Sequence, residues 1–396
     1  MKRFPLALQL ALALVLGVLA GLALGPRAAP LKHVTTLVVD LLKTLAGPLV
    51  FFAILDAFAR TEIEARKGAK LLGISFMNAC VAGGIALAVS NLLPFGRRVP
   101  QGVFASQPPH PSSPPLRGGE GMSLIETLFP EPPNTLGIVL LALLLGLALR
   151  RLPQEDRAPL AAFSSAAFKL LATTLGWIVK IVPLAAFCVL AQVTGTSGLK
   201  VLETLASFVF LVTLAITLHV VVYYALLLYA LGGIPPWKFF PAGLEALLTA
   251  FTTGSSLATL PVTLRTLDDM KVSPESARLA ACVGTNLNHD GILLYEAVAA
   301  LFVAQALGQD LTLAQQGLAV VTSALAAVGI AGIPDAGFIT LTLVLGSVGL
   351  PASAAPVLLP VDWFLGRLRA SANVASDLTV ANLLDAQSLG GQGSRS

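Results

Sequence analysis

Long apolar runs follow one another along most of this 396-residue chain, and they restrict its fold more than any other feature. A helix needs about 20 apolar residues to cross a bilayer. With 56% apolar and only 12% charged residues, the composition excludes a soluble globular enzyme and a nucleic-acid binder. The sequence therefore predicts an all-α integral membrane protein. The predicted helices of its first part cover residues 4–24, 33–58, 70–93, 135–149, 160–193 and 199–231.

Basic residues at the ends of the predicted helices indicate their orientation. Lys2 and Arg3 precede the first run, and the short loops after the second and fourth helices are also rich in Lys and Arg. Because cytoplasmic loops carry this excess, we expect a multi-pass protein of the inner (plasma) membrane with a cytoplasmic N-terminus. The run at residues 4–24 is longer than a signal peptide needs, so it is interpreted as a transmembrane helix.

A polar segment at residues 95–134 separates the third and fourth helices and holds nine of the 26 prolines. Such a composition cannot bury apolar area, which predicts an exposed, partly disordered loop on the extracellular side. A proline-rich ligand for a partner domain and a tolerated insertion are both open, and the insertion is favoured.

Beyond residue 231 the apolar runs are broken near their middles by small and polar residues. The breaks are TTGSS at 252–256, NHDG at 288–291 and GIAGIPDAG at 329–337. Non-helical backbone at membrane depth is tolerated only where it lines a cavity or meets protein, and paired breaks indicate a transporter binding site. We therefore expect the binding site in the C-terminal part of the chain.

The last helix carries a polar stripe. At 100° per residue, Asp362, Arg369, Asn373 and Asp377 fall within about 80° of one another. Ionisable groups are costly inside a bilayer, so the stripe should face protein or water. A transport site is favoured over a buried ion pair that locks helices together, because two carboxylates exceed one guanidinium.

The NHDG segment places Asp290 beside backbone that can leave the helix at Gly291, and oxygen ligands of this kind suit a hard cation. A plain helix kink is the alternative. His289 could pack or titrate, and His219 has no partner at ligand spacing, so we expect it to be structural or exposed. The interior carboxylates predict coupled uptake, in which cations admit an anion held by Arg369 with Ser255 and Ser256. The chain has no phosphate-binding loop that would support ATP drive.

Four stretches resemble one known family, the dicarboxylate/amino acid:cation symporters, which include glutamate and aspartate transporters. They are AFTTGSSLATLPVT from residue 250, NHDG, GIAGIPDAG, and DWFLGRLRASANVASDLT from residue 362. The likeness covers residues 4–385 and is specific from residue 245. It implies eight transmembrane helices plus two re-entrant helical hairpins, an elevator mechanism and a homotrimer.

This resemblance implies the following organisation of the chain. Residues 1–68 hold the first two scaffold helices, 69–94 the third helix, which belongs to the transport domain, and 95–134 the proline-rich loop. Residues 135–157 and 158–195 hold the fourth and fifth scaffold helices, and 196–236 the sixth helix, again of the transport domain. Residues 237–385 form the transport core, in the order hairpin, helix, hairpin, helix, and 386–396 a disordered tail.

The resemblance also implies ligands for sodium and substrate. One sodium site would use Asn288, Asn373, Asp377 and a carbonyl near Gly284. A deeper site would use Asp290 and Asn78, and a third would use carbonyls of Asn286, Ala327, Val328 and Ile330. Substrate would contact Ser256, Arg369, Asn373 and the second hairpin around Ile333 and Gly337. Sodium ions, a small carboxylate and lipid are the expected partners, with no organic cofactor and no nucleic acid.

Departures from the family pattern bear on the substrate. Gly366 stands where amino-acid transporters place an Asp for the substrate ammonium group, which favours a C4-dicarboxylate such as succinate. The alternative is an acidic or neutral amino acid, because Asp335 replaces a usual glycine and could bind an ammonium group. Retained Asp377 favours sodium as the coupled ion.

A remote alternative is an intramembrane hydrolase that uses either Asp362 with Asp377 or Ser256 with His289. The two aspartates are about 22 Å apart along a helix, too far to share a proton. The Ser/His pair lacks a third, orienting group close in sequence. We therefore predict a transporter and not an enzyme. An uncoupled anion channel would leave the cation ligands without a role.

Overall fold

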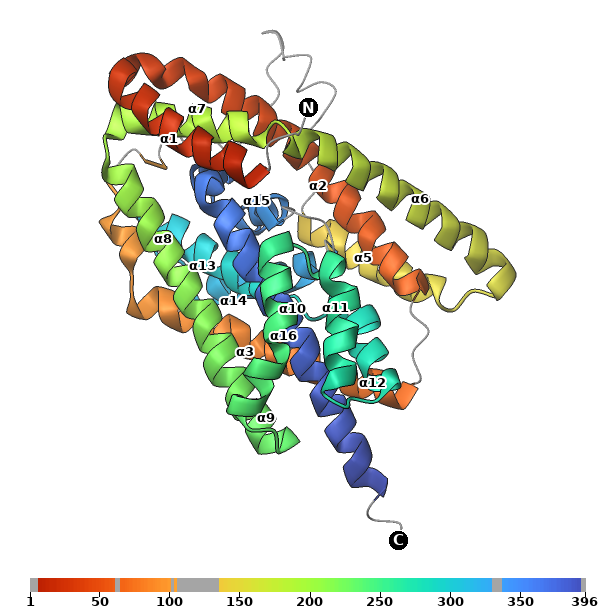
Figure 1. Ribbon diagram of the computed structural model, residues 1–396. Coiled ribbons are helices and arrows are strands. Elements are labelled where there is room, and N and C mark those ends of the chain that lie inside the picture. Colours follow the sequence, from red (N-terminus) through yellow and green to blue (C-terminus); the bar gives the residue numbers. More distant parts are fainter. Residues whose placement is uncertain (1–5, 61–64, 101–102, 105–134, 330–336, 393–396) are drawn as a thin grey trace, which may run out of the picture.

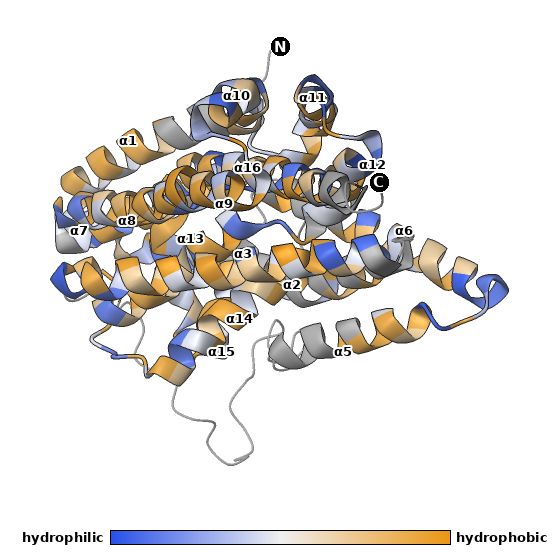
Figure 2. Ribbon diagram, turned by 90° about the horizontal axis from the view of Figure 1, so that it is seen from below, coloured by the Kyte–Doolittle hydropathy of each residue, from blue (hydrophilic) through white to orange (hydrophobic). Residues whose placement is uncertain are grey.

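The computed structural model describes residues 6–60, 65–100, 103–104, 135–329 and 337–392. Within these ranges all regular structure is helical, which confirms the predicted all-α class. Three stretches are long and apolar enough to cross a membrane by length and composition: Leu12–Thr35, Lys67–Arg98 and Lys200–Gly232. Figure 2 shows apolar residues along outer helices such as α1 and α5. Large apolar side chains of this surface, among them Leu144 and Leu170, are more than 60% exposed, as lipid-facing residues are.

One group of helices lies at the periphery and comes from the first half of the chain. Its helix α1 packs on α7, and α2 packs on α5, α6 and α7. Gly21 permits close approach of α1 to α7, because a Cβ atom there would lie 2.6 Å from the carbonyl oxygen of Ala191. The bounds are α1 (Leu6–Leu24), η1 (Gly25–Leu31), α2 (Lys32–Arg60), α5 (Thr135–Leu149), α6 (Gln154–Val179) and α7 (Val182–Ser197).

The prediction of one helix over residues 160–193 is wrong, because the structure has α6 and α7 there. Pro183 has no N–H group and cannot continue the hydrogen-bond ladder of α6, so the helix ends at Val179. The start of α6 is also earlier than predicted. Glu155 and Asp156 occupy its first turn, where the positive end of the helix dipole favours carboxylates.

A second group of helices surrounds α16, which runs through the middle of the molecule (Figure 1). Helix α13 is buried along almost its whole length and packs on α3, α8, α14 and α16. A π-helical segment, η3, joins α8 to α9 without a loop. The bounds are α3 (Ala65–Leu92), α8 (Lys200–Thr217), η3 (Leu218–Tyr223), α9 (Tyr224–Gly232), α13 (Asp290–Ala306), η6 (Ala352–Leu358) and α16 (Leu359–Gln392).

Two pairs of helices stand at the predicted hairpin positions. Helix α10 (Pro236–Thr253) ends at Gly254, whose φ of 67° is left-handed, and α11 (Ser256–Asp269) begins at once, capped by Ser255. Helices α14 (Leu313–Gly329) and α15 (Gly337–Ser347) also pack on each other. The break predicted at TTGSS is therefore present, and the residues between α14 and α15 lie outside the described part of the chain.

The break predicted at NHDG is also present. The chain passes through α12 (Pro274–Arg278), η4 (Leu279–Val283) and η5 (Gly284–Asn286), leaves the helical path at residues 287–289, and starts α13 at Asp290. His289 has φ −99° and ψ 43°, which are not helical values. This unwound backbone lies beside α16, because α16 contacts both η4 and η5.

Two expectations about loops need correction. The start of the proline-rich segment is partly buried: η2 (Phe95–Arg98) contacts α13, and Phe104 is 5% exposed, with its ring packed against Phe302, while Arg97 and Arg98 stay exposed. These apolar side chains cover the end of α13, while residues 105–134 lie outside the described part. The tail predicted to be disordered from residue 386 continues α16 as helix to Gln392.

Candidate functional site

Asn288 and Asp377 form the first buried polar cluster. The Asn288 amide Nδ2 donates to Asp377 Oδ1 at 3.0 Å, and Thr285 Oγ1 donates to Asp377 Oδ2 at 3.3 Å. Ser75 on α3 donates to Asn288 Oδ1 at 2.7 Å. Asn288 and Asp377 are 1% and 3% exposed. The unwound segment thus brings an amide and a hydroxyl to a carboxylate of α16, as the predicted pairing of Asn288 with Asp377 requires.

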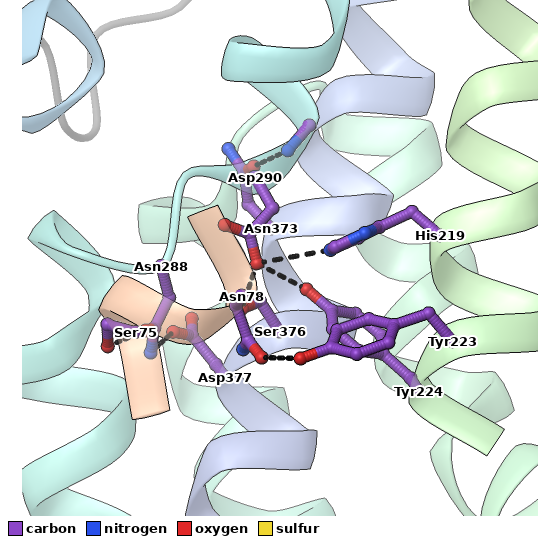
Figure 3. A network of polar contacts seen from close by, with 11 residues as sticks. Ser75, Asn78, His219, Tyr223, Tyr224, Asn288, Asp290, Asn373, Ser376 and Asp377 are labelled. Atoms are coloured by element: carbon purple, nitrogen blue, oxygen red, sulfur yellow. Dashed lines mark hydrogen bonds and ion pairs between the residues drawn. The ribbon is translucent and has the colours of Figure 1, made fainter. Parts of the chain in front are cut away.

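Asp290 is the centre of a second cluster, shown in Figure 3. Its Oδ2 atom accepts hydrogen bonds from Tyr224 at 2.5 Å and from Ser376 at 2.9 Å, and His219 Nε2 lies 3.4 Å away. His219 is completely buried, so of the two predicted alternatives, structural or exposed, the structure contradicts exposure. Because 71 residues separate His219 from Asp290, ligand spacing in the sequence carries no signal for this pair.

Asn78 belongs to the same network. Its Oδ1 atom accepts a hydrogen bond from the Tyr223 hydroxyl at 2.9 Å, and the rings of Tyr223 and Tyr224 lie 5.6 Å apart. Asn78 is completely buried, and among the described residues its Nδ2 atom has no hydrogen-bond partner. The structure therefore brings Asn78 into the surroundings of Asp290 through two tyrosines of the η3–α9 junction that sequence reasoning missed.

Asn373 connects the unwound segment to the polar stripe of α16. Its Oδ1 atom accepts a hydrogen bond from the backbone N–H of Gly291 at 3.0 Å. A Cβ atom at Gly291 would lie 2.5 Å from the carbonyl oxygen of Arg369, so only glycine permits this approach of α13 to α16. Asn373 thus holds the first turn of α13 in register with the polar stripe.

Arg369 lies in a third buried cluster. Its Nη1 and Nη2 atoms are 2.7 Å and 3.3 Å from the two carboxylate oxygens of Asp362. The guanidinium carbon lies 4.1 Å from the centre of the Tyr295 ring. Arg369 and Asp362 are 4% and 5% exposed. The predicted stripe therefore contains an ion pair, which joins two residues of the same helix.

Glu296 is a further carboxylate that sequence reasoning missed. It is completely buried on α13 and accepts a hydrogen bond from the Thr340 hydroxyl of α15. It lies within electrostatic range of Arg369 and Asp362. The sequence does contain one indication of Glu296, which is its position inside an apolar run. An ionisable residue inside a predicted membrane span is by default a candidate functional residue.

The other predicted ligands fall into three groups. The Ser255 hydroxyl caps α11 by accepting a hydrogen bond from the Ala258 N–H group at 3.2 Å. Ser256 lies in the first turn of α11 and is 8% exposed. Helix α11 packs on α16. The carbonyl of Gly284 accepts hydrogen bonds from the N–H groups of residues 287 and 288. Helix α14, which carries buried Ala327 and half-buried Val328, contacts η5, the element that ends at Asn286. Ile330, Ile333 and Asp335 lie outside the described residues.

Gly337 and Gly366 lie close to the third cluster. A Cβ atom at Gly337 would be 3.0 Å from the guanidinium carbon of Arg369, so the first residue of α15 rests directly against this group. Gly366 lies between Asp362 and Arg369 on α16, one turn after the aspartate.

Two helix pairs and an interrupted helix around buried polar clusters are the arrangement of a secondary transporter. A family model confirms this class. The chain belongs to the sodium:dicarboxylate symporter family, whose model matches residues 6–387. It is accordingly a multi-pass membrane protein of a transporter family.

Similar curated proteins are excitatory amino acid transporters. Excitatory amino acid transporter 1 of Ambystoma tigrinum is 35% identical over 256 residues, 64% of this chain and 47% of the relative. The Homo sapiens protein of the same name is 33% identical over 271 residues, 66% and 50% of the two chains. Excitatory amino acid transporter 3 of Mus musculus is 32% identical over 255 residues, 63% and 48%. The chain spans about half the length of these relatives.

Proposed function

We propose that this protein is a sodium-coupled symporter of a small carboxylate. The observation that carries the proposal is the charge of the buried residues in the described part of the chain. They include four carboxylates, Asp290, Glu296, Asp362 and Asp377, against the single guanidinium of Arg369. An uncompensated charge in a membrane interior is expensive, so cations must accompany any anion that enters.

The two clusters around Asp377 and Asp290 are the proposed sodium sites. Each offers carboxylate, amide or hydroxyl oxygens, which are the ligands of hard cations. We propose a third site from carbonyls of Asn286, Ala327, Val328 and Ile330, as the family resemblance implies. An elevator movement, a homotrimer and a cytoplasmic N-terminus belong to the same proposal.

An acidic or neutral amino acid is the proposed substrate, in place of the C4-dicarboxylate predicted first. The names of the similar proteins, which are excitatory amino acid transporters, support this choice. The family as a whole is named for dicarboxylates, so the class of substrate is the point to test.

Uptake into proteoliposomes tests the proposal. The purified full chain is reconstituted, and uptake of labelled aspartate, alanine and succinate is followed with an inward sodium gradient at fixed pH. We expect uptake of an amino acid that stops when choline replaces sodium. Uptake that is indifferent to sodium, or uptake of no carboxylate, would contradict the symporter.

A further inference from the structure

The residues around Arg369 restrict the class of substrate more than the glycine at position 366 does. The guanidinium is paired with Asp362 through two nitrogen atoms, and Glu296 lies within electrostatic range of both groups. The Asp362 carboxylate therefore balances the positive charge of Arg369, and the Glu296 carboxylate lies within electrostatic range of it. A dianion that entered this cluster would meet an arginine whose charge is already neutralised.

The ion pair of Asp362 and Arg369 spans the turn of α16 that holds Gly366. Asp362 and Arg369 are seven residues apart, about two helical turns, and their side chains meet across the turn that holds Gly366. The helix therefore keeps a carboxylate at the site, but one turn nearer to its N-terminus.

Buried polar atoms lie beside this ion pair. The Tyr295 hydroxyl group and the Oε2 atom of Glu296 are buried and, among the described residues, form no hydrogen bond of good geometry, although Tyr295 interacts with Asp362 and Glu296 with Ser323. Burial of such groups without a good hydrogen bond costs free energy. A bound ligand that carries both donors and acceptors would satisfy them, and both residues interact electrostatically with Asp362 and Arg369.

We propose that Asp362 receives the ammonium group of the substrate, so that it determines specificity for a zwitterionic amino acid over its deaminated analogue. This inference rests on the proposed function. An α-amino acid carries its ammonium and carboxylate groups on adjacent carbon atoms, which matches an aspartate and a guanidinium held 2.7 Å apart. Binding of an amino acid replaces the Asp362–Arg369 ion pair by two ion pairs with the substrate. A dicarboxylate would instead leave Asp362 without a positively charged partner.

The test compares substrates that differ only in the ammonium group. Proteoliposomes containing the full chain take up labelled L-aspartate under a sodium gradient, and succinate competes; alanine and propionate form a second pair. We expect the amino acid of a pair to bind about tenfold or more tightly than its deaminated analogue. In Asp362→Asn this preference should shrink to about twofold or less, through a higher KM for the amino acid.

Two further variants keep the outcome decisive. The single variant Asp362→Asn leaves the buried guanidinium of Arg369 without its carboxylate. The double variant with Asp362→Asn and Gly366→Asp returns a carboxylate one turn away. We expect it to restore the preference for the amino acid. Asp335→Asn tests the other candidate ammonium ligand that the sequence suggests, and it should keep the preference if Asp362 has this role. An equal loss of both compounds of a pair in Asp362→Asn would overturn the inference and give Asp362 only a role in positioning Arg369.

The wild-type result separates this inference from the function on which it rests. Sodium-driven uptake of succinate with no preference for aspartate overturns the role of Asp362 and leaves the symporter intact. Sodium-independent behaviour toward every compound overturns the symporter itself. Loss of the preference in Asp335→Asn, with Asp362→Asn unchanged, would assign the ammonium group to the second hairpin.

Discussion

At the residue scale, the carboxylate of Asp377 is held by donors from the unwound segment before α13. Asn288 and Thr285 donate to its two oxygens, and all three side chains are buried. A neutral amide at position 377 would keep the shape of the side chain while removing the charge that attracts a cation. The residue therefore tests the sodium site separately from the substrate site.

We expect Asp377→Asn to raise the sodium concentration for half-maximal uptake by about tenfold or more, equivalent to about 1.4 kcal/mol of binding free energy. The measurement is the sodium dependence of uptake in proteoliposomes at saturating substrate. Ser371→Ala is the control, since Ser371 lies on the same helix and bonds only the carbonyl of Leu247 among the described residues. Equal sodium curves for both variants would contradict the site.

Gly337 is the second residue that can be tested alone. Its added Cβ atom would lie 3.0 Å from the guanidinium carbon of Arg369, so Gly337→Ala should displace this group and raise the substrate KM by about tenfold. Gly346→Ala is the matched control, because it lies on the same helix α15 and has open space around it. The expectation fails if the two variants give the same KM.

At the element scale, the seam between α1 and α7 depends on small residues. Gly17 and Gly21 let the backbone of α1 approach α7 so closely that Cβ atoms would meet its backbone at 2.9 Å and 2.6 Å. Small residues that permit close backbone contact are typical of helix association in membranes. The seam joins two helices that are far apart in the sequence and helps to hold the peripheral group together.

Gly21→Ala should therefore destabilise the protein by about 1–3 kcal/mol, the usual cost of overpacking. Thermal unfolding in detergent checks this, with Gly73→Ala of α3 as the control because no atom lies within 4 Å of its added Cβ. Equal unfolding temperatures of the Gly21→Ala and Gly73→Ala variants would contradict the need for a glycine at position 21 in the packing of α1 on α7. Neither glycine touches the polar clusters, so sodium affinity should stay unchanged in both variants.

At the scale of the whole molecule, the helices form a peripheral group and a group around α16. They meet where α2 contacts α14 and α15, and where α7 contacts η6. The polar clusters come from α3, η3, α9, η5, the unwound residues 287–289, α13, α15 and α16, and none of their described members lies in the peripheral group. A movement of this group as one body would carry both proposed sodium sites and Arg369 together.

The predicted homotrimer is tested at the same scale. Native mass spectrometry of the protein released from detergent should give the mass of three chains, with single chains appearing only on stronger activation. A dominant single-chain mass under gentle conditions would contradict the trimer.

Most of the architecture could be predicted from the sequence. Long apolar runs, the breaks at TTGSS and NHDG, and the stripe on α16 are local patterns of composition and periodicity. The split between α6 and α7 was missed although Pro183 marks it, because a run of apolar residues outweighed one breaker. The packing of Phe104 on Phe302 was missed because a polar loop gives no periodic signal.

Residue type and spacing are enough to show that the chain is helical, lies in lipid and holds unbalanced charges in its last helices. Only the tertiary structure decided which partners those charges have. His219 and Tyr224 reach Asp290, and Tyr223 reaches Asn78, across 66 to 145 residues. Contacts at such separations depend on how helices pack, which no local pattern encodes.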